Sequence, residues 1–268
     1  MICWIGSFRS FALGSKMKTI IVLPAYNAEK TLEKTIAEIP EEMTQEIILV
    51  DDASKDRTIE IARRLGLMIR VHPRNRGYGA NQKSCYREAL QNGAEIIVML
   101  HPDYQYDPKA IPQLVEAIQK GEADAVFGSR MLDGKTIEQG MPRWKYCGNR
   151  FLTIVENRVL GLGLSEYHCG FRAYRASLLR QIPFERNSNG FVFDSQIIIQ
   201  LALLKARFKE IPIKTRYFPE ASTISFKDSI LYTCAIFWAL IRFCLFQRYG
   251  LFKEYHITKT QKCYRDTE

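Results

Sequence analysis

An octapeptide rich in acidic and metal-binding side chains, His101-Pro-Asp-Tyr-Gln-Tyr-Asp-Pro108, follows directly after an apolar run. That run, residues 95–100, reads Glu-Ile-Ile-Val-Met-Leu and is typical of a strand buried in a parallel sheet. In open α/β sheets, ligands bind in the crevice at the carboxyl ends of the strands. Asp103 and its neighbours therefore lie where a divalent cation bound to phosphate is expected, and the segment predicts a sugar-nucleotide site.

Apolar runs and helix-like segments alternate along the first half of the chain. Strands are expected at 19–23, 46–50, 67–71, 96–100 and 125–127, with helices at 29–39, 56–65, 79–91 and 111–120. Such alternation is typical of βαβ units with right-handed crossovers. It predicts an α/β fold with a mostly parallel central sheet and helices on both faces, in a Rossmann-like arrangement. A helix at 143–160 and a late strand at 170–174 are expected to form the acceptor side.

The glycine-rich turns that bind phosphate in two large enzyme classes are missing from the sequence. There is no G-x-G-x-x-G after the first strand and no G-x-x-x-x-G-K-[ST] anywhere, which argues against a Rossmann dehydrogenase and a P-loop NTPase. Pro24-Ala-Tyr-Asn27 follows the first expected strand instead, and Asp51-Asp-Ala-Ser-Lys-Asp-Arg-Thr58 follows the second. Alone, each segment is weak evidence, because carboxylates after a strand are often only helix caps and surface groups.

Seven segments occur in one order between about residues 18 and 226: LPAYNAEKTL, ILVDDASKDRT, RGYGANQK, MLHPDYQYDP, GSRML, HCGFRAYR and FVFDSQ. In this order they resemble the family 2 glycosyltransferases, in the branch that includes polyprenyl- and dolichyl-phosphate sugar synthases. Several elements in one order are far more specific than any one of them. The resemblance implies a GT-A fold, a UDP- or GDP-sugar donor, a divalent cation and inversion at the anomeric carbon.

The same resemblance assigns residues to the nucleotide. Pro24 and Tyr26 would border the base, and Asp51 and Asp52 would hydrogen-bond the base and the ribose. Asp103 would reach the donor through the cation.

The metal-binding segment of the family falls on His101, Asp103 and Gln105. His101 stands where many relatives of this branch have an aspartate, so Asp103 is left as the single carboxylate at the metal. Imidazole is acceptable to Mn²⁺ but suits Mg²⁺ poorly, because Mg²⁺ prefers oxygen ligands. Mn²⁺ is therefore favoured over Mg²⁺ if His101 ligates the metal. The alternative is a histidine that supports or caps the site while Asp103 alone holds the cation.

Three further residues are candidates for the catalytic step. The arginines that contact phosphate in the synthases fall on Arg130 and Arg143, which with the cation would neutralise the departing diphosphate. A hydroxyl acceptor must also lose a proton, and Asp194 is the candidate base. A polyprenyl phosphate is already anionic and needs orientation more than deprotonation. Asp194 could equally cap a helix at 197–204, and Gln196 stands where several synthases carry a glutamate.

Arg172 and His168 lie close to where the resemblance places the acceptor phosphate or sugar. Arg172 is the better anion ligand of the two, because a guanidinium binds phosphate oxygens in pairs. A nucleophilic pair of Cys169 and His168 is not expected, since adjacent residues on a strand point to opposite faces.

Composition divides the 268 residues into a core and two end segments. Residues 17–226 would form the transferase domain, after an extension at 1–16 that makes a poor signal peptide. Seven scattered cysteines argue against a disulfide framework and a zinc site and indicate a reducing, cytoplasmic compartment. The net charge is +9, and residues 201–268 hold 12 Lys and Arg against 6 Asp and Glu, so the tail at 227–268 is basic.

Within this tail, residues 230–246 are apolar almost throughout and fall just short of the length that spans a bilayer. Lys227 before the run and Arg242 and Arg248 near its end suit a helix that lies in the membrane interface. A helix that covers the sheet is the alternative. The favoured hypothesis is a cation-dependent inverting glycosyltransferase, peripheral at the cytoplasmic face of the membrane, which uses a lipid-phosphate or lipid-linked glycan acceptor in cell-envelope glycan synthesis.

Other functions remain open from the sequence. One is transfer to a glycan hydroxyl with Asp194 as base. Another is a nucleotide-sugar-binding protein of the same fold without turnover, suggested by His101 and Gln196. Nucleic-acid binding is not expected, because the chain lacks an aromatic RNA-binding signature and a DNA-reading motif.

Overall fold

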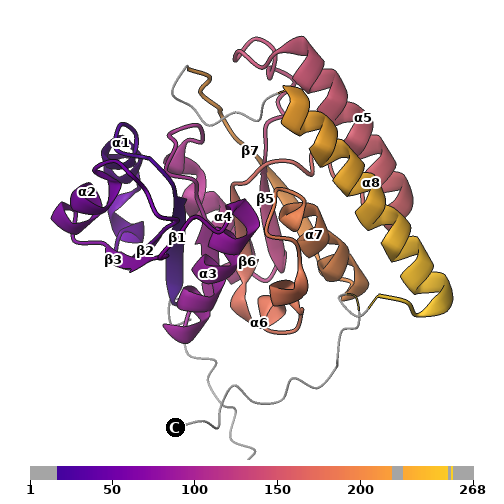
Figure 1. The fold of residues 1–268 in the computed structure, drawn as a ribbon, viewed down its shortest axis with the longest axis horizontal. Helices are drawn as coiled ribbons and strands as arrows, with labels where there is room; N and C mark the ends of the chain where they lie inside the picture. The colour runs from indigo at the N-terminus through magenta and orange to yellow at the C-terminus, as the bar shows by residue number, and fades with distance from the viewer. Residues whose placement is uncertain (1–16, 219–225, 253–254, 256–268) are drawn as a thin grey trace, which may run out of the picture.

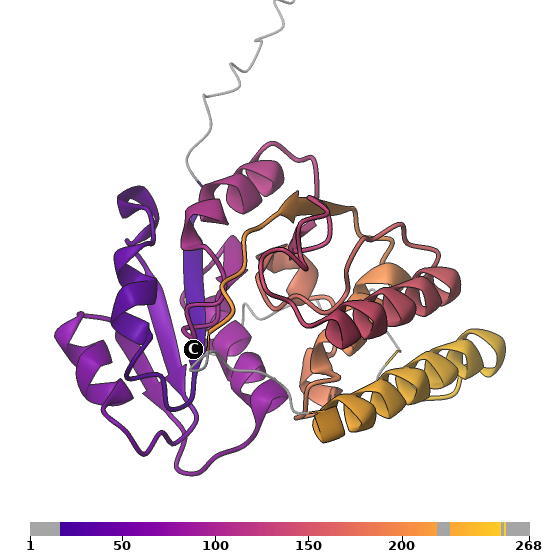
Figure 2. The same cartoon turned by 90° about the horizontal axis from the view of Figure 1, so that it is seen from above.

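One mixed sheet forms the centre of the structure, a computed structural model that describes residues 17–218, 226–252 and 255 (Figures 1 and 2). Its strands stand in the order β3-β2-β1-β4-β6-β5-β7. Every neighbouring pair is parallel except those of β6, which is antiparallel to both β4 and β5. The strands are β1 (Thr19–Ala25), β2 (Ile47–Asp51), β3 (Met68–Val71), β4 (Ile96–Met99), β5 (Ala125–Ser129), β6 (Arg172–Arg175) and β7 (Phe208–Pro212).

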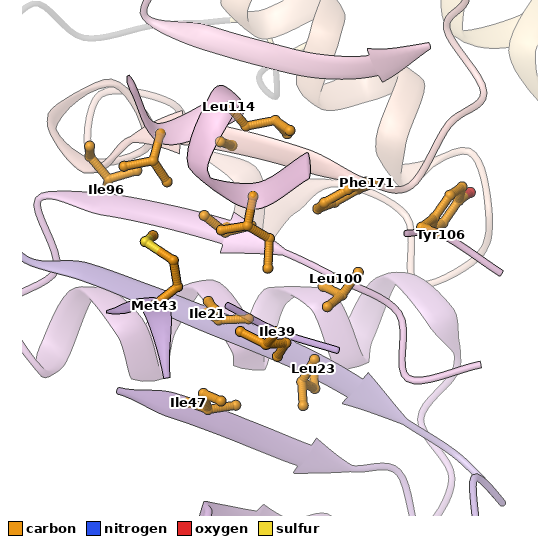
Figure 3. Packing of buried hydrophobic residues seen from close by; sticks show 14 of the residues in the cluster. Ile21, Leu23, Ile39, Met43, Ile47, Ile96, Leu100, Tyr106, Leu114 and Phe171 are labelled. Atoms are coloured by element: carbon orange, nitrogen blue, oxygen red, sulfur yellow. The ribbon is translucent and has the colours of Figure 1, made fainter. Parts of the chain in front are cut away.

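Helices cover both faces of this sheet, as expected for the α/β fold. In β1, Ile21 and Leu23 belong to the hydrophobic cluster of one face (Figure 3), whereas Ile20 and Val22 belong to that of the other. The first cluster includes α1 (Leu32–Ala37), α2 (Thr58–Arg64) and α4 (Ile111–Gln119), and the second includes α3 (Tyr78–Gln91), α6 (Ala176–Leu179) and α7 (Phe193–Leu203). Short 3₁₀ turns lie at Glu41–Met43, Pro108–Ala110 and Phe184–Arg186.

Two long helices, α5 (Arg143–Leu160) and α8 (Phe226–Tyr249), lie side by side outside α7 (Figures 1 and 2). Leu152, Ile199 and Ile236, one from each of α5, α7 and α8, pack in a third hydrophobic cluster. Because α8 covers one side of α7 and the sheet covers the other, nine of the eleven residues of α7 are buried. The additional helices are thus part of the folded domain.

The structure departs from the expected elements at the C-terminal end. β7 was not predicted, because its sequence, Phe-Lys-Glu-Ile-Pro, mixes charged and apolar residues on a half-exposed edge strand. The expectation that the apolar segment at 230–246 is too short to span a bilayer is wrong, because the helix extends beyond it through polar residues at both ends. Among the described residues, Asp228–Tyr249 forms 22 residues of helix long and apolar enough to cross a membrane. The extension 1–16 and most of the tail after 252 lie outside the described residues.

The sheet topology brings distant segments to one edge. The carboxyl ends of β1, β2, β4 and β5 meet there because these strands are parallel within one twisted sheet. β6 runs in the opposite direction, so its amino end, preceded by His168 and Gly170, reaches the same edge. The residues after β4 and those before β6 therefore face one another although about 70 positions separate them.

The start of α3 is locked onto the loop that leads into α7. The backbone N–H of Gly79 donates to the carbonyl of Asn189 over 2.7 Å. A Cβ at Gly79 would lie 2.6 Å from the carbonyl oxygen of Ser188 and 2.8 Å from Cβ of Phe193. Buried Lys83, one turn further on, donates to the carbonyl of Asn187. The RGYGANQK segment therefore holds in place the loop that leads to Asp194.

Gly79→Ala should destabilise the fold by about 1–3 kcal/mol, because the new methyl group meets backbone that cannot yield easily. Gly148→Ala is the matched control, since Gly148 is also helical and a Cβ there meets nothing within 4 Å. That control should be neutral or gain up to about 1 kcal/mol of helix propensity. Urea unfolding of both variants measures the difference, and an equal response of the two would contradict the tight contact.

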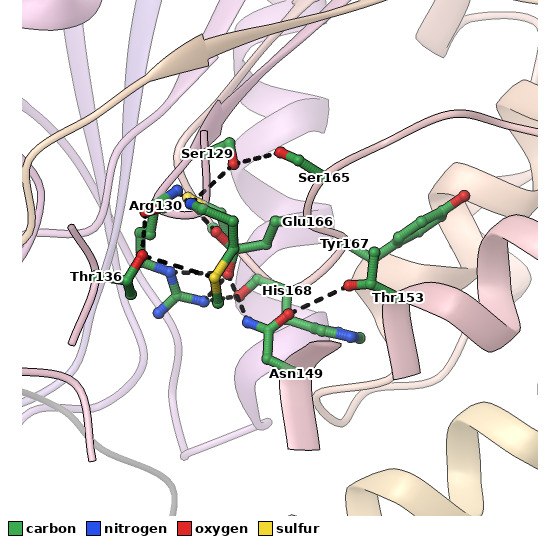
Figure 4. Close-up of polar contacts among 12 residues, drawn as sticks. Ser129, Arg130, Thr136, Asn149, Thr153, Ser165, Glu166, Tyr167 and His168 are labelled. Carbon is green, nitrogen blue, oxygen red and sulfur yellow. Dashed lines mark hydrogen bonds and ion pairs between the residues drawn. The ribbon is translucent and has the colours of Figure 1, made fainter. Parts of the chain in front are cut away.

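A buried ion pair joins the loop after β5 to the loop before β6. The Arg130 guanidinium pairs with fully buried Glu166, whose carboxylate also accepts from the backbone N–H of Arg130 at 2.9 Å and from Asn149 Nδ2 at 2.7 Å (Figure 4). Burial alone would raise the pKa of Glu166, but the charge of Arg130 and these hydrogen bonds outweigh it and lower the pKa. The pair stabilises the fold as long as Glu166 is ionised.

This lowered pKa predicts an acid-sensitive contribution to stability. A carboxyl whose pKa is lower in the folded state stabilises the fold above its usual value of 4.5, and the contribution is lost as the pH falls through the folded-state pKa. Glu166→Gln should therefore cost roughly 3–5 kcal/mol at neutral pH and less in acid, because it breaks a buried pair. Glu185→Gln, which breaks the exposed pair with Arg87, should cost no more than about 1 kcal/mol. If the free energies of unfolding of wild type and Glu166→Gln differed by the same amount from neutral to acid pH, the lowered pKa of Glu166 would be refuted.

Candidate active site

A pocket of about 250 Å³ opens at the edge of the sheet where the strand ends meet. One end is lined by residues that follow β4, among them His101, Asp103 and Gln105. The opposite side is lined by the first turns of α5 and α8, including Lys145 and Tyr232. The pocket thus connects the predicted metal-binding segment with the two outer helices.

Asp194 lines this pocket and is held from two sides. The hydroxyl of Tyr78 donates to its Oδ2 over 2.8 Å, and Nη1 of Arg172 lies 3.3 Å from its Oδ1. Asp194 does not cap α7, because the helix begins one residue earlier, with Val192 at the N-cap and no side-chain cap. The geometry argues against the capping alternative and presents a fixed carboxylate to the pocket.

Arg172 does not line the pocket, and its position argues against the predicted contact with the acceptor. The side chain is 1% exposed and lies over the ring of Phe127. Its Nε donates to the carbonyl of Cys169 over 2.6 Å and its Nη2 to that of Tyr167 over 2.8 Å. The guanidinium is thus engaged by two backbone carbonyls and by Asp194. Arg172 therefore holds the Asp194 carboxylate in place without lining the pocket itself. The sequence could not reveal this, since a buried and an exposed arginine look alike in it.

The imidazole of His101 points toward the same network. Its ring is parallel to that of Tyr78, and its Nε2 lies 3.4 Å from the Tyr78 hydroxyl. The close packing requires Gly170, where a Cβ would lie 2.5 Å from Nε2. Burial lowers the pKa of His101, although Asp103 and Asp194 oppose the shift. This arrangement favours the supporting role for His101 over the role of metal ligand.

Asp103 is the residue best suited to a cation. Its Oδ1 accepts from the backbone N–H of Gln105 over 3.1 Å, and no described basic side chain forms an ion pair with it. Burial raises the pKa of Asp103, and this effect outweighs the opposing influence of His101 and of the backbone hydrogen bonds. A divalent cation fits here, with oxygen ligands from Asp103, the Gln105 amide and a diphosphate. No described group of three or more His, Cys, Asp or Glu forms a ready-made metal site.

The predicted nucleotide-binding residues lie at the ends of β1 and β2. Pro24 is the last-but-one residue of β1, and Tyr26 follows the strand with 49% of its surface exposed. Asp51 is fully buried. Its Oδ2 accepts from the backbone N–H of Ser54 over 2.8 Å, and its Oδ1 has no partner among the described residues. An unsatisfied buried acceptor beside an exposed ring is a suitable place for a nucleotide base.

Asp52 is used within the protein. Its carboxylate is 2.7 Å from Nδ1 of His72 and accepts from the backbone N–H groups of Arg76 and Gly77, each over 2.9 Å. These bonds argue against the predicted contact with the ribose, because they occupy both oxygens. His72 carried no functional signal in the sequence, and here it fixes the segment between β3 and α3.

The two predicted phosphate-binding arginines differ in position. Arg130 lines the pocket, paired with Glu166. Arg143, the first residue of α5, is exposed and does not line it. Lys145, two residues further along, does line the pocket, and burial with the nearby charge of Arg130 lowers its pKa. Sequence reasoning missed Lys145, whose only signal was its place beside Arg143.

His168 lies in the pocket wall, and its role toward an acceptor stays a prediction. Its Nδ1 is 3.0 Å from the hydroxyl of Tyr232 in α8, and Arg130 donates to its carbonyl. This part of the pocket wall is thus made by the loop before β6 together with α8.

Comparison with known proteins agrees with this geometry. The profile described as Glycosyl transferase family 2 matches residues 20–183. The undecaprenyl-phosphate mannosyltransferase of Micrococcus luteus is 30% identical over 74% of this chain and 83% of its own length. The UDP-N-acetylglucosamine–dolichyl-phosphate N-acetylglucosaminyltransferase of Methanococcus voltae is 27% identical over 74% of this chain and 85% of its own length.

Among solved structures, the glucosyl-3-phosphoglycerate synthase of Mycobacterium tuberculosis in complex with phosphoglyceric acid superimposes with a TM-score of 0.67. It is 20% identical in sequence, and the alignment covers 85% of this chain and 80% of that one. The likeness establishes the GT-A fold. Together with the profile match, it follows that the chain belongs to glycosyl transferase family 2 and is a glycosyltransferase related to the polyprenyl-phosphate sugar synthases.

Proposed function

We propose that the protein is a cation-dependent, inverting transferase that moves a sugar from a UDP- or GDP-sugar to a polyprenyl phosphate or lipid-linked acceptor. The observation that carries this proposal is the continuity of one pocket. It begins at Asp103, where a cation and diphosphate fit, and ends between α5 and α8, which carry exposed apolar side chains. A donor made of nucleotide and sugar and an acceptor with a lipid tail would enter such a pocket from opposite ends.

The donor end would bind the nucleotide through strand-end residues. Asp51 would accept a hydrogen bond from the base, with Tyr26 and Pro24 beside it. Asp103 and Gln105 would hold the cation, which when bound supplies positive charge to the departing diphosphate. Oxygen ligands suit both Mn²⁺ and Mg²⁺. Mn²⁺ stays the favoured ion, since structural relatives are described in complex with Mn²⁺ and uridine diphosphate.

The acceptor end would receive an anion. Lys145 and Arg130 supply positive charge there, and an ionised phosphate attacks the sugar without prior loss of a proton. Asp194 would orient the reacting groups. Its carboxylate already accepts from Tyr78 and faces Arg172, which leaves less capacity to take a proton from a hydroxyl. This geometry favours the phosphate acceptor over transfer to a glycan hydroxyl with Asp194 as base.

Membrane contact would come from an apolar face, defined by Phe151 and Ile154 of α5 and by Ile230, Leu231, Trp238 and Ile241 of α8. Their exposed fractions range from 49% to 61%. The residues recur along each helix at intervals that keep them on one side. Exposed Arg158 on α5 and exposed Arg248 near the end of α8 suit anionic headgroups. We propose that both helices lie in the interface at the cytoplasmic surface.

Release of nucleoside diphosphate by the purified protein tests the reaction. With Mn²⁺ and a panel of UDP- and GDP-sugars, one donor should give release that rises when a short polyprenyl phosphate is added. Chelation should abolish release, and Asp103→Asn should reduce kcat by roughly 10²-fold or more, because the leaving group loses its charge stabilisation. Asp107→Asn, a change to an exposed helix-capping carboxylate of the same segment, is the control. Release that ignores the lipid phosphate would move the acceptor to a hydroxyl.

Binding to vesicles tests the apolar face. Ile154→Ser should weaken binding to vesicles of anionic phospholipid by about tenfold, because burial of an isoleucine side chain is worth roughly 1.5–3 kcal/mol. Ile137→Ser is the matched control, since Ile137 is 43% exposed but lies in the segment between β5 and α5. Equal loss of binding in both variants would count against the face, and so would no loss in either.

A further inference from the structure

Glu156 of α5 is a buried carboxylate behind the pocket wall. Its side chain is 1% exposed, and neither of its oxygens accepts a hydrogen bond from the described residues. The nearest basic group is Nε2 of His168, 3.2 Å from Oε2. An unpaired carboxylate in such a place is costly, so a protonated imidazole is the group that would balance its charge.

The other nitrogen of His168 faces the pocket side. Nδ1 lies 3.0 Å from the hydroxyl of Tyr232, and both residues line the pocket. Burial raises the pKa of Tyr232, so the hydroxyl keeps its proton. When both imidazole nitrogens carry protons, Nδ1 donates to the Tyr232 oxygen, and the tyrosine O–H is left to donate elsewhere. Asp194 and Ser195 of α7 also lie near enough to this hydroxyl to influence its pKa.

We propose that Glu156 is a positioning residue that acts through His168 to make the Tyr232 hydroxyl a hydrogen-bond donor for the phosphate of the acceptor. The inference rests on the proposed function and deepens it, because it assigns recognition of an anionic acceptor to α8. Without the carboxylate of Glu156, the imidazole of His168 would be neutral, and its Nδ1 could accept a hydrogen bond from the Tyr232 hydroxyl. The hydroxyl would then turn away from an anion in the pocket and present lone pairs to it.

Binding of two probes with the same isoprenoid chain tests the proposal without turnover. Farnesyl phosphate and farnesol differ only in the phosphate, and both are titrated into the full-length protein by calorimetry. Glu156→Gln and Tyr232→Phe should each weaken binding of farnesyl phosphate by about tenfold and leave farnesol unchanged, as loss of one charge-assisted hydrogen bond predicts. The double variant should bind farnesyl phosphate about as tightly as each single variant, because both changes remove the same interaction.

Tyr167→Phe is the matched control. Tyr167 is buried next to His168 and donates to Asn157 over 2.9 Å, but it does not line the pocket. This variant should bind both probes as the wild type does. Equal weakening of both probes by Glu156→Gln, or no effect of Tyr232→Phe on farnesyl phosphate, would overturn the proposal.

The ion pair between Glu156 and His168 is measured separately by ¹⁵N NMR of the protein labelled at histidine, and the variant His168→Asn assigns the His168 signals. At neutral pH, the wild type should show two protonated ring nitrogens for His168, and Glu156→Gln should show one. A neutral His168 in the wild type would refute the mechanism. Failure of the proposed function is a different result, namely no sugar transfer to lipid phosphate from any donor, and it is measured on the wild type alone.

Discussion

A buried guanidinium must find an acceptor for each of its N–H groups, and this requirement at Arg172 organises the site. Arg172 stands at the first position of β6 and obtains carbonyls from the loop that precedes its own strand and a carboxylate from α7. Since Asp194 is also bonded to Tyr78 of α3, three elements converge on one carboxylate. Removal of the guanidinium would leave two buried carbonyls and an anion unsatisfied, a far greater cost than a lost surface contact.

The same principle extends across the pocket wall. Arg130 has Glu166 and Arg172 has Asp194, so both of these guanidinium groups close to the pocket meet a carboxylate from another element, and the imidazole of His168 faces Glu156. Lys145 differs, because the described residues contain no ion pair to it and its contact is with the ring of Trp144. The proposed function, in which the site receives anions and releases them, would benefit from this division. Paired cations hold the wall rigid, and an unpaired lysine remains to respond to the substrate.

Sequence reasoning located the edge of the sheet at which the pocket opens, because strand ends are visible in a sequence. The apolar runs ending near Pro24, Asp51 and Leu100 predicted where the carboxyl ends of β1, β2 and β4 would meet, and the parallel topology confirms it. It could not tell which of these polar residues remain free for a ligand. Asp51 and Asp52 are adjacent and identical in type, yet Asp51 keeps an oxygen without a partner among the described residues, while both oxygens of Asp52 accept hydrogen bonds from His72 or from backbone N–H groups. That difference arises from contacts with residues 20 or more positions away.

The position of α8 gives the pocket a property that the GT-A sheet alone would lack. The sheet and its helices supply one end of the pocket, but Tyr232 and its neighbours close the other end from a helix whose opposite side is exposed and apolar. α8 is held against α7 and α5 by an apolar cluster and by the contact of Tyr232 with His168. Any partner that binds the exposed side therefore acts on the same helix that completes the pocket. If the acceptor is a lipid phosphate, as proposed above, one helix would meet both the membrane and the headgroup that emerges from it.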